Sequence, residues 1–310
     1  MRLRYLFALL AISCYGYELT GRIEPAATFA VFLHGTSAPF EASTESDASG
    51  HFQFRKLASG AYTLVVSTSA RGELQRTIEL SPGTVDSRGG LNIALRIEDG
   101  RLESDGKRST GATVSATALS LPDSAVREYR EAQRCLSRRD SDCASGHLTR
   151  AVQIAPGFVA AWNQLGTIAY QTQRYAEAET NFRRALGADH EAFEPLVNLG
   201  GVLLNLRRPE EAIEYNKQAV ARRPNDALAN SQLGMSYLQL NEFDQAESYL
   251  KTAVLLDPAH FSHPQLSLAS IYIMKGDRQS AVTALRGFLE QHPDSPAAAG
   301  IRGKIAQLSR

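Results

Sequence analysis

The fold of most of this chain is decided by residues 193–226, which read FEPLVNLGGVLLNLRRPEEAIEYNKQAVARRPND. Residues 227–260 follow directly and read ALANSQLGMSYLQLNEFDQAESYLKTAVLLDPAH. The two stretches place a glycine, two alanines and a proline at the same offsets. Self-similarity with a period of this length indicates a solenoid, in which similar supersecondary units stack on their neighbours.

The repeat extends in both directions from this pair. Five segments align, with starting positions spaced by 34, 34, 34 and 35 residues: 125–158, 159–192, 193–226, 227–260 and 262–295. Small residues fill the eighth position (Ala132, Gly166, Gly200, Gly234, Ala269), the twentieth (Ala144, Ala178, Ala212, Ala246, Ala281) and most of the twenty-seventh (Ala151, Ala185, Ala219, Ala253, Phe288). Small side chains let the two helices of a hairpin approach closely, and a bulky one would overpack by ~1–3 kcal/mol.

These columns resemble those of the tetratricopeptide repeat (TPR) family, from Ala125 to Ser295. The resemblance implies five helix hairpins that stack into a right-handed superhelix. A proline near the end of four segments cannot continue a helix and so ends the second one. The first repeat departs from the pattern, because Glu128 and Glu131 occupy positions that are usually apolar. Such departures are expected of terminal repeats.

The residues before the repeats, 17–101, follow a period of two. Leu91–Ile97 alternates apolar and polar side chains, as a half-buried strand does. Four further segments show a similar pattern: Thr28–Leu33, His51–Phe54, Tyr62–Val66 and Leu74–Leu80. Turn signals rich in glycine, serine and proline separate them. This spacing predicts a small antiparallel β-sandwich of about six strands.

Two motifs in this region resemble the core of carboxypeptidase regulatory-like domains. They are Asp47–Phe54 (DASGHFQF) and Leu57–Leu64 (LASGAYTL). The resemblance implies a transthyretin-like, non-catalytic module that accompanies other domains in exported proteins. Gly50 and Gly60 are then expected in backbone conformations that a Cβ atom disfavours. We assign Asp47 to a turn, because too few carboxylates lie near it to form a calcium cage.

Two further segments complete the chain. Residues 102–124 are rich in serine, threonine, glycine and charged residues, which is typical of a linker. Residues 296–310 carry Ile301, Ile305 and Leu308 on one helical face, which predicts a capping helix over the fifth repeat. The predicted fold is therefore multidomain: an all-β sandwich followed by an all-α TPR solenoid of five helix hairpins and a cap.

The TPR resemblance also implies where a partner would bind, because the first helices of the hairpins line a concave groove. The partner-binding positions are Asn163, Thr167, Tyr170, Gln171, Val197, Leu204, Asn205, Ser231, Met235, Leu238, Gln239 and Ile273. None is Lys or Arg, which argues against the carboxylate clamp that holds chaperone C-termini. Amides beside apolar side chains favour an extended, largely uncharged protein or peptide. The alternatives are a groove that binds nothing specific, or one that packs against the chain's own β-sandwich.

Residues 1–16 have the features of an export signal. Met1–Arg4 is a short positive segment, and the apolar run Tyr5–Ile12 is far too short to span a bilayer. Ala11–Cys14 resembles the lipobox of bacterial lipoproteins, which makes Cys14 a candidate for lipidation and membrane anchoring. Plain secretion with an incidental cysteine is the alternative. We expect an extracytoplasmic bacterial protein that is periplasmic, anchored to the outer membrane or secreted.

The remaining cysteines, Cys135 and Cys143, are a candidate disulfide pair, because an oxidising compartment permits the bond. The bond would contribute ~2 kcal/mol in the chain-entropy view. Two free cysteines packed in a helical hairpin are the alternative.

Composition and motifs exclude several function classes. The formal net charge is zero, so no basic face suited to nucleic acid is expected. The sequence has no nucleophile elbow, phosphate-binding loop or His-Glu-x-x-His motif, and we expect neither an enzyme nor a cofactor. We interpret His260 and His263 as surface turn residues and expect no metal site.

The leading hypothesis is a non-enzymatic exported scaffold that binds a protein or extended peptide in the TPR groove. One alternative is glycan or cell-envelope binding through the β-sandwich, which an exposed aromatic pair on one β face would favour. Another is a structural lipoprotein of an envelope assembly or secretion complex.

Overall fold

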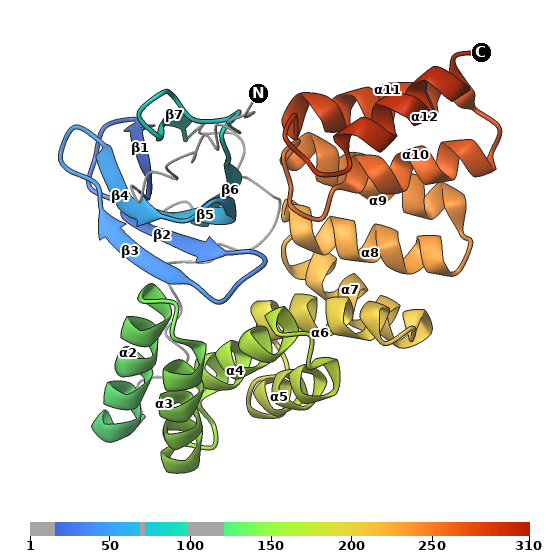
Figure 1. Ribbon diagram of the computed structural model, residues 1–310. Helices are drawn as coiled ribbons and strands as arrows, with labels where there is room; N and C mark the ends of the chain where they lie inside the picture. Colours follow the sequence, from blue (N-terminus) through green and yellow to red (C-terminus); the bar gives the residue numbers. More distant parts are fainter. Residues whose placement is uncertain (1–15, 69–71, 98–120) are drawn as a thin grey trace, which may run out of the picture.

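The computed structural model describes residues 16–68, 72–97 and 121–310 (Figure 1). Within these ranges seven strands precede eleven helices. The strands are β1 (Tyr17–Glu24), β2 (Ala30–Gly35), β3 (Glu41–Glu45), β4 (His51–Leu57), β5 (Gly60–Thr68), β6 (Gly72–Leu80) and β7 (Gly90–Arg96). They form a three-stranded sheet in the order β4-β1-β7 and a four-stranded sheet in the order β3-β2-β5-β6.

The two sheets bury one shared apolar core, as the period-two pattern predicts. Phe52 and Phe54 of β4 face this core, and Leu64 and Val66 of β5 face it too. The all-β prediction is confirmed, with one difference in topology. β1 pairs antiparallel with β4 but parallel with β7, because β7 returns to the first sheet from β6 at the edge of the second.

The turn before β4 has the conformation expected from its sequence. Asp47 Oδ1 accepts hydrogen bonds from the backbone N–H groups of Ser49 (2.8 Å) and His51 (3.0 Å). Gly50 follows with a φ of +80°, where L side chains are rarely found. The carboxylate of Asp47 is therefore used to shape the turn.

The helices form five hairpins and a final single helix. They are α2 (Asp123–Ser137), α3 (Ser141–Ile154), α4 (Val159–Gln171), α5 (Tyr175–Ala188), α6 (Phe193–Asn205), α7 (Pro209–Arg222), α8 (Ala227–Gln239), α9 (Phe243–Leu256), α10 (Pro264–Met274), α11 (Arg278–Gln291) and α12 (Ala298–Leu308). The small residues of the repeat columns are buried where paired helices touch. The predicted solenoid of five hairpins and a cap is confirmed.

The last helix closes the apolar end of the array. Ile301 of α12 is buried against Leu285 and Phe288 of α11, and Ile305 and Leu308 pack at the margin of this cluster. The cap was predicted from these three apolar residues of α12. Among the described residues no helix is long and apolar enough to cross a membrane.

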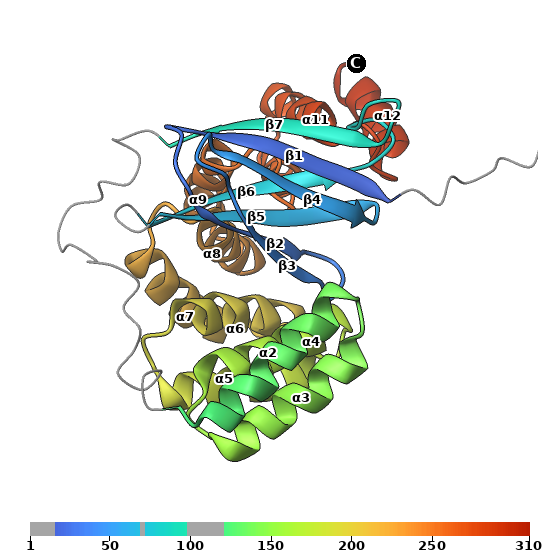
Figure 2. The ribbon, with the colours of Figure 1, turned by 90° about the vertical axis from the view of Figure 1, so that its left-hand side faces the viewer.

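The helical array bends around the β-sheets (Figure 1). Helices α2 and α3 lie beneath the four-stranded sheet, and the ends of α8 to α11 lie beside it. Figure 2, turned by 90°, shows the same arrangement, with the sheets above α2 and in front of α8, α9 and α11. The β-sheets therefore occupy the angle between the first and last repeats.

Candidate partner-binding surface

Both edges of the four-stranded sheet contact the repeats. At the β2–β3 edge the contacts come from repeats one and two. The hydrogen bonds run from Gln133 Nε2 to Glu41 Oε1 (3.2 Å), from Arg139 to the Tyr62 hydroxyl (2.9 Å) and from Gln171 Nε2 to the Gly35 carbonyl (2.8 Å). The Arg139 guanidinium also lies 4.7 Å above the centre of the Phe40 ring. This cation–π contact joins the start of the array to the sheet.

At the opposite edge, strand β6 is held by three equivalent residues of successive repeats. Arg223, Asp257 and His292 all occupy the thirty-first repeat position, and each is the C-cap of its helix. Their partners alternate along β6 with the core-facing Leu74, Ile78 and Leu80. The contacts are Arg223 to Glu73 (3.7 Å), Asp257 Oδ2 to the Thr77 N–H (2.9 Å) and His292 Nδ1 to Glu79 Oε2 (2.7 Å).

The contact continues into the turn that follows β6. The carboxylate of Asp294 accepts hydrogen bonds from the Ser81 hydroxyl (2.9 Å) and from the Gly83 N–H. An edge strand normally offers unpaired N–H and C=O groups to any other strand. Here one of those groups, the Thr77 N–H, is paired with a side chain of the chain's own repeats.

His260 and His292 are buried at this edge and His263 is half-buried, so the interpretation of His260 as a surface turn residue is wrong. His260 and His292 are each only 3–4% exposed, and the rings of His263 and His292 lie 4.5 Å apart in an edge-to-face arrangement. Burial lowers the pKa of His260 to about 4 and also lowers the pKa of His263. Sequence reasoning missed this cluster because His292, at the end of α11, lies in a different loop from His260 and His263.

The predicted groove positions divide into buried and accessible ones. Val197, Leu204 and Ser231 are buried, because neighbouring first helices pack on them. Gly201 allows α6 and α8 to lie close together, because a Cβ atom added there would lie 2.6 Å from the side-chain amide of Gln232. These three residues are therefore part of the core between repeats. The remaining nine predicted positions are half-buried or exposed.

The amides among these positions form hydrogen bonds within the chain. Asn205 Nδ2 donates to the Tyr170 hydroxyl of the preceding repeat (3.1 Å), and Gln239 Nε2 lies 3.4 Å from the Leu204 carbonyl. Gln171 instead donates to the sheet, at Gly35. One predicted alternative was that the groove packs against the chain's own β-sandwich. The hydrogen bond from Gln171 to Gly35 is such a contact.

Two exposed apolar side chains lie at the end of helix α10, at the groove positions of repeat five. Of the four large apolar side chains exposed in the described ranges, Ile273 (38%) and Met274 (53%) end helix α10, whereas Ile154 and Leu255 end second helices. Ile273 occupies the twelfth repeat position, equivalent to Leu238 in the preceding repeat. None of the four lies on the described β-strands. The exposed aromatic pair that would favour glycan binding is therefore not found there.

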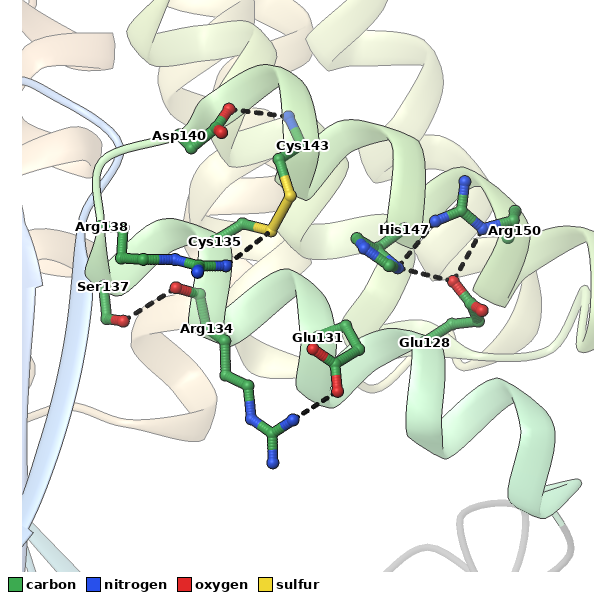
Figure 3. The surroundings of a disulfide bond; sticks show 10 residues. All are labelled: Glu128, Glu131, Arg134, Cys135, Ser137, Arg138, Asp140, Cys143, His147 and Arg150. Carbon is green, nitrogen blue, oxygen red and sulfur yellow. Dashed lines mark hydrogen bonds and ion pairs between the residues drawn. A yellow bond between two sulfur atoms is a disulfide. The ribbon is translucent and has the colours of Figure 1, made fainter.

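The two remaining cysteines meet across the first hairpin (Figure 3). Cys135 of α2 and Cys143 of α3 have their sulfur atoms 2.01 Å apart and their Cα atoms 5.8 Å apart. Beside them, Glu128 accepts hydrogen bonds from His147 and Arg150, which lower the pKa of its carboxyl group. Residue Cys14 and the whole proposed export signal up to residue 15 lie outside the described residues.

Sequence comparison identifies the repeat array. Two family models, both described as tetratricopeptide repeat, match residues 129–192 and 163–227, and residues 203–265 and 237–305. Together the matches run from residue 129 to residue 305, which is more than half of the chain. The chain is a tetratricopeptide repeat protein with an N-terminal β-sheet region.

Curated relatives match part of the chain. Anaphase-promoting complex subunit 3 of Schizosaccharomyces pombe is 24% identical over 184 residues, covering 59% of this chain and 26% of the relative. The human cell division cycle protein 16 homolog is 29% identical over 124 residues, covering 37% and 20% respectively. The chain thus spans about a quarter or less of the length of these relatives.

Solved structures agree on the fold. PilW, described as a widely conserved type IV pilus biogenesis factor, has a TM-score of 0.54 at 23% identity, covering 60% of this chain and 86% of PilW. A MamA fragment from Desulfovibrio magneticus RS-1 has a TM-score of 0.51 at 23% identity, covering 57% and 99%. Tetratricopeptide repeats imply a scaffold that binds proteins or peptides, and no enzyme domain was found.

Proposed function

We propose that this protein is a scaffold that binds an extended, largely uncharged protein segment at the open end of its repeat groove. The observation that carries the proposal is the exposure of Ile273 and Met274 at the end of α10. Exposed apolar side chains of this size are suited to bury the side chains of a partner. Leu238 and Gln239 occupy the equivalent positions of the preceding repeat and continue the surface.

The position of the β-sheets supports binding of the partner at this end of the groove. At repeat two the equivalent residue, Gln171, is already hydrogen-bonded to Gly35 of the sheet. In repeats three to five the sheet touches the opposite helix ends, through the C-cap residues of α7, α9 and α11. The C-terminal ends of α8 and α10 therefore point away from the sheet (Figure 1). A partner would contact repeats four and five.

Site-specific photo-crosslinking tests the proposed surface. We would place a photoreactive amino acid at Ile273 and, as a matched control, at Leu255, which is 72% exposed at the end of the second helix α9. Crosslinking in the native host should give a discrete adduct at residue 273 that is absent at residue 255. A second variant, Met274→Glu, should remove that adduct because it places a charge in an apolar contact.

The control separates specific binding from general adhesion. Equal adducts at both positions, or an adduct at 273 that survives Met274→Glu, would contradict the proposal. Mass spectrometry of the adduct identifies the partner. A partner segment rich in charged residues would also count against an uncharged groove ligand.

We further propose that the protein is exported, and that residues 17–101 form a carboxypeptidase regulatory-like module. The positive and apolar segments of residues 1–16 support export, and the motifs Asp47–Phe54 and Leu57–Leu64 support the module. Mass spectrometry of the mature amino terminus is the test. An acylated Cys14 would support a lipoprotein, cleavage without acylation would support secretion, and an intact Met1 would contradict export.

A further inference from the structure

The first helical hairpin brings three metal-binding side chains together, two cysteines and one histidine (Figure 3). Cys143 and His147 lie one helical turn apart on α3, so both face Cys135 on α2. The two sulfur atoms and a ring nitrogen of His147 all lie within 4.8 Å of one another. It is the single such group of three among the described His, Cys, Asp and Glu residues.

A neighbouring carboxylate orients the histidine. Nδ1 of His147 lies 2.7 Å from Glu128 Oε2, and Arg150 Nε donates to the same oxygen at 2.8 Å. When Nδ1 carries the proton and donates to Glu128, the lone pair of the histidine is on Nε2. A second nitrogen of Arg150 lies 2.7 Å from Nδ1 and would donate there only in the other tautomer. A carboxylate that holds one histidine nitrogen is the usual second partner of a metal-binding histidine.

We propose that, when the Cys135–Cys143 bond is reduced, Cys135, Cys143 and His147 form a binding site for Zn²⁺. A dithiol or phosphine reductant supplies two electrons, which break the S–S bond, and two protons from water or the reductant give the thiols. Binding of Zn²⁺ then releases both thiol protons and forms two Zn–S bonds and one Zn–N bond. The reductant leaves as its own disulfide or phosphine oxide.

The ligand set matches zinc chemistry. Two thiolates and one imidazole are ligands that Zn²⁺ prefers in tetrahedral sites, and three protein ligands leave the fourth position to water. Cys143 and His147 are half-buried, so the site has access to solvent. The hairpin would then be cross-linked in either redox state, by the S–S bond or by the metal.

The test uses the full chain in a Cys14→Ser background, which removes the third thiol. Reduced protein is incubated with Zn²⁺ under anaerobic conditions, passed over a desalting column and assayed for zinc per chain by mass spectrometry. We expect about one bound Zn²⁺ in the reduced protein and none in the oxidised protein. With Co²⁺ in place of Zn²⁺, the reduced protein should show a thiolate-to-cobalt charge-transfer band.

Three variants locate the ligands. Cys143→Ser and His147→Asn should lose the bound metal, and Glu128→Gln should weaken Zn²⁺ affinity by about 10–100-fold. His190→Asn, an exposed histidine of the second repeat, should leave binding unchanged. Circular dichroism checks that each variant is folded. Reduced protein that retains no zinc, or a His147→Asn variant that binds as tightly as the parent, would overturn the proposal.

Discussion

At the scale of single residues, His260 shows how burial changes the chemistry of a side chain. The N–H of Ser262 donates to His260 Nδ1 (3.2 Å), and the Ser262 hydroxyl lies 2.7 Å from the same atom. A proton on Nδ1 would remove the backbone hydrogen bond. Burial disfavours the charged ring further, and the pKa falls to about 4 although nearby Asp257 raises it.

This depressed pKa predicts an acid-sensitive fold. An unfolded histidine titrates near 6.5, so between about pH 6.5 and pH 4 the unfolded chain binds a proton that the folded chain excludes. The stability contributed by the neutral His260 ring is thus fully present above pH 6.5 and is lost as the pH falls toward 4. We expect the free energy of unfolding to be about 2 kcal/mol lower at pH 5 than at pH 7 from this residue.

Urea denaturation at the two pH values measures this loss. His260→Gln should be less stable at pH 7, but its stability should change less between pH 7 and pH 5. An equal pH dependence in the parent and the variant would show that other groups are responsible. His51, an exposed histidine of β4, provides the control substitution His51→Gln, which should keep the full pH dependence.

At the scale of elements, close helix contact depends on the absence of a side chain. A Cβ added at Gly200 of α6 would lie 1.9 Å from Oδ1 of Asn216, which is fully buried on α7. Gly287 of α11 is also helical, and an added Cβ would meet nothing within 4 Å. Substituting each glycine by alanine therefore distinguishes the effect of close packing, at Gly200, from the effect of helix propensity alone, at Gly287.

The Gly200→Ala substitution should destabilise the protein by about 1–3 kcal/mol, because Asn216 must move away from Ser236, to which it donates at 2.9 Å. Gly287→Ala should stabilise it by about 0.5–1 kcal/mol, since alanine is the better helix former. Thermal unfolding of both variants provides the comparison. Stabilisation by Gly200→Ala would contradict the expected clash between the added Cβ and Asn216.

Elements were largely predictable because their signals are local. The repeat columns located every helix pair, and alternation located five strands. Strand β3 was not predicted, because its residues Glu41–Glu45 (EASTE) have no apolar alternation. The burial of Val197 and Leu204 was also missed, because it depends on how closely neighbouring first helices pack.

At the scale of the whole molecule, the ladder of contacts along β6 joins the two regions. Asp257 accepts a hydrogen bond from the buried Thr77 N–H, whereas the carboxylate of Asp189, at the same position of repeat two, accepts one from the nearby Glu191 N–H. No sequence pattern indicates this docking. Its partners are separated by 180 residues and become neighbours only when the array bends around the sheet.

The Asp257→Ala substitution should leave the Thr77 N–H buried without a partner and cost about 1–3 kcal/mol. Hydrogen exchange in a peptide covering residues 73–81 should become faster. Asp189→Ala is the matched control and should leave exchange in that peptide unchanged. Unchanged exchange in Asp257→Ala would mean that the strand is protected by other contacts.

The β6 ladder also limits how this protein can evolve. A solenoid usually gains or loses repeats with little consequence, because each repeat contacts only its neighbours. Here repeats three, four and five each supply one contact to successive places on a single nine-residue strand. An extra hairpin inserted among them would move every later contact out of register. The strand therefore fixes the spacing of repeats three to five.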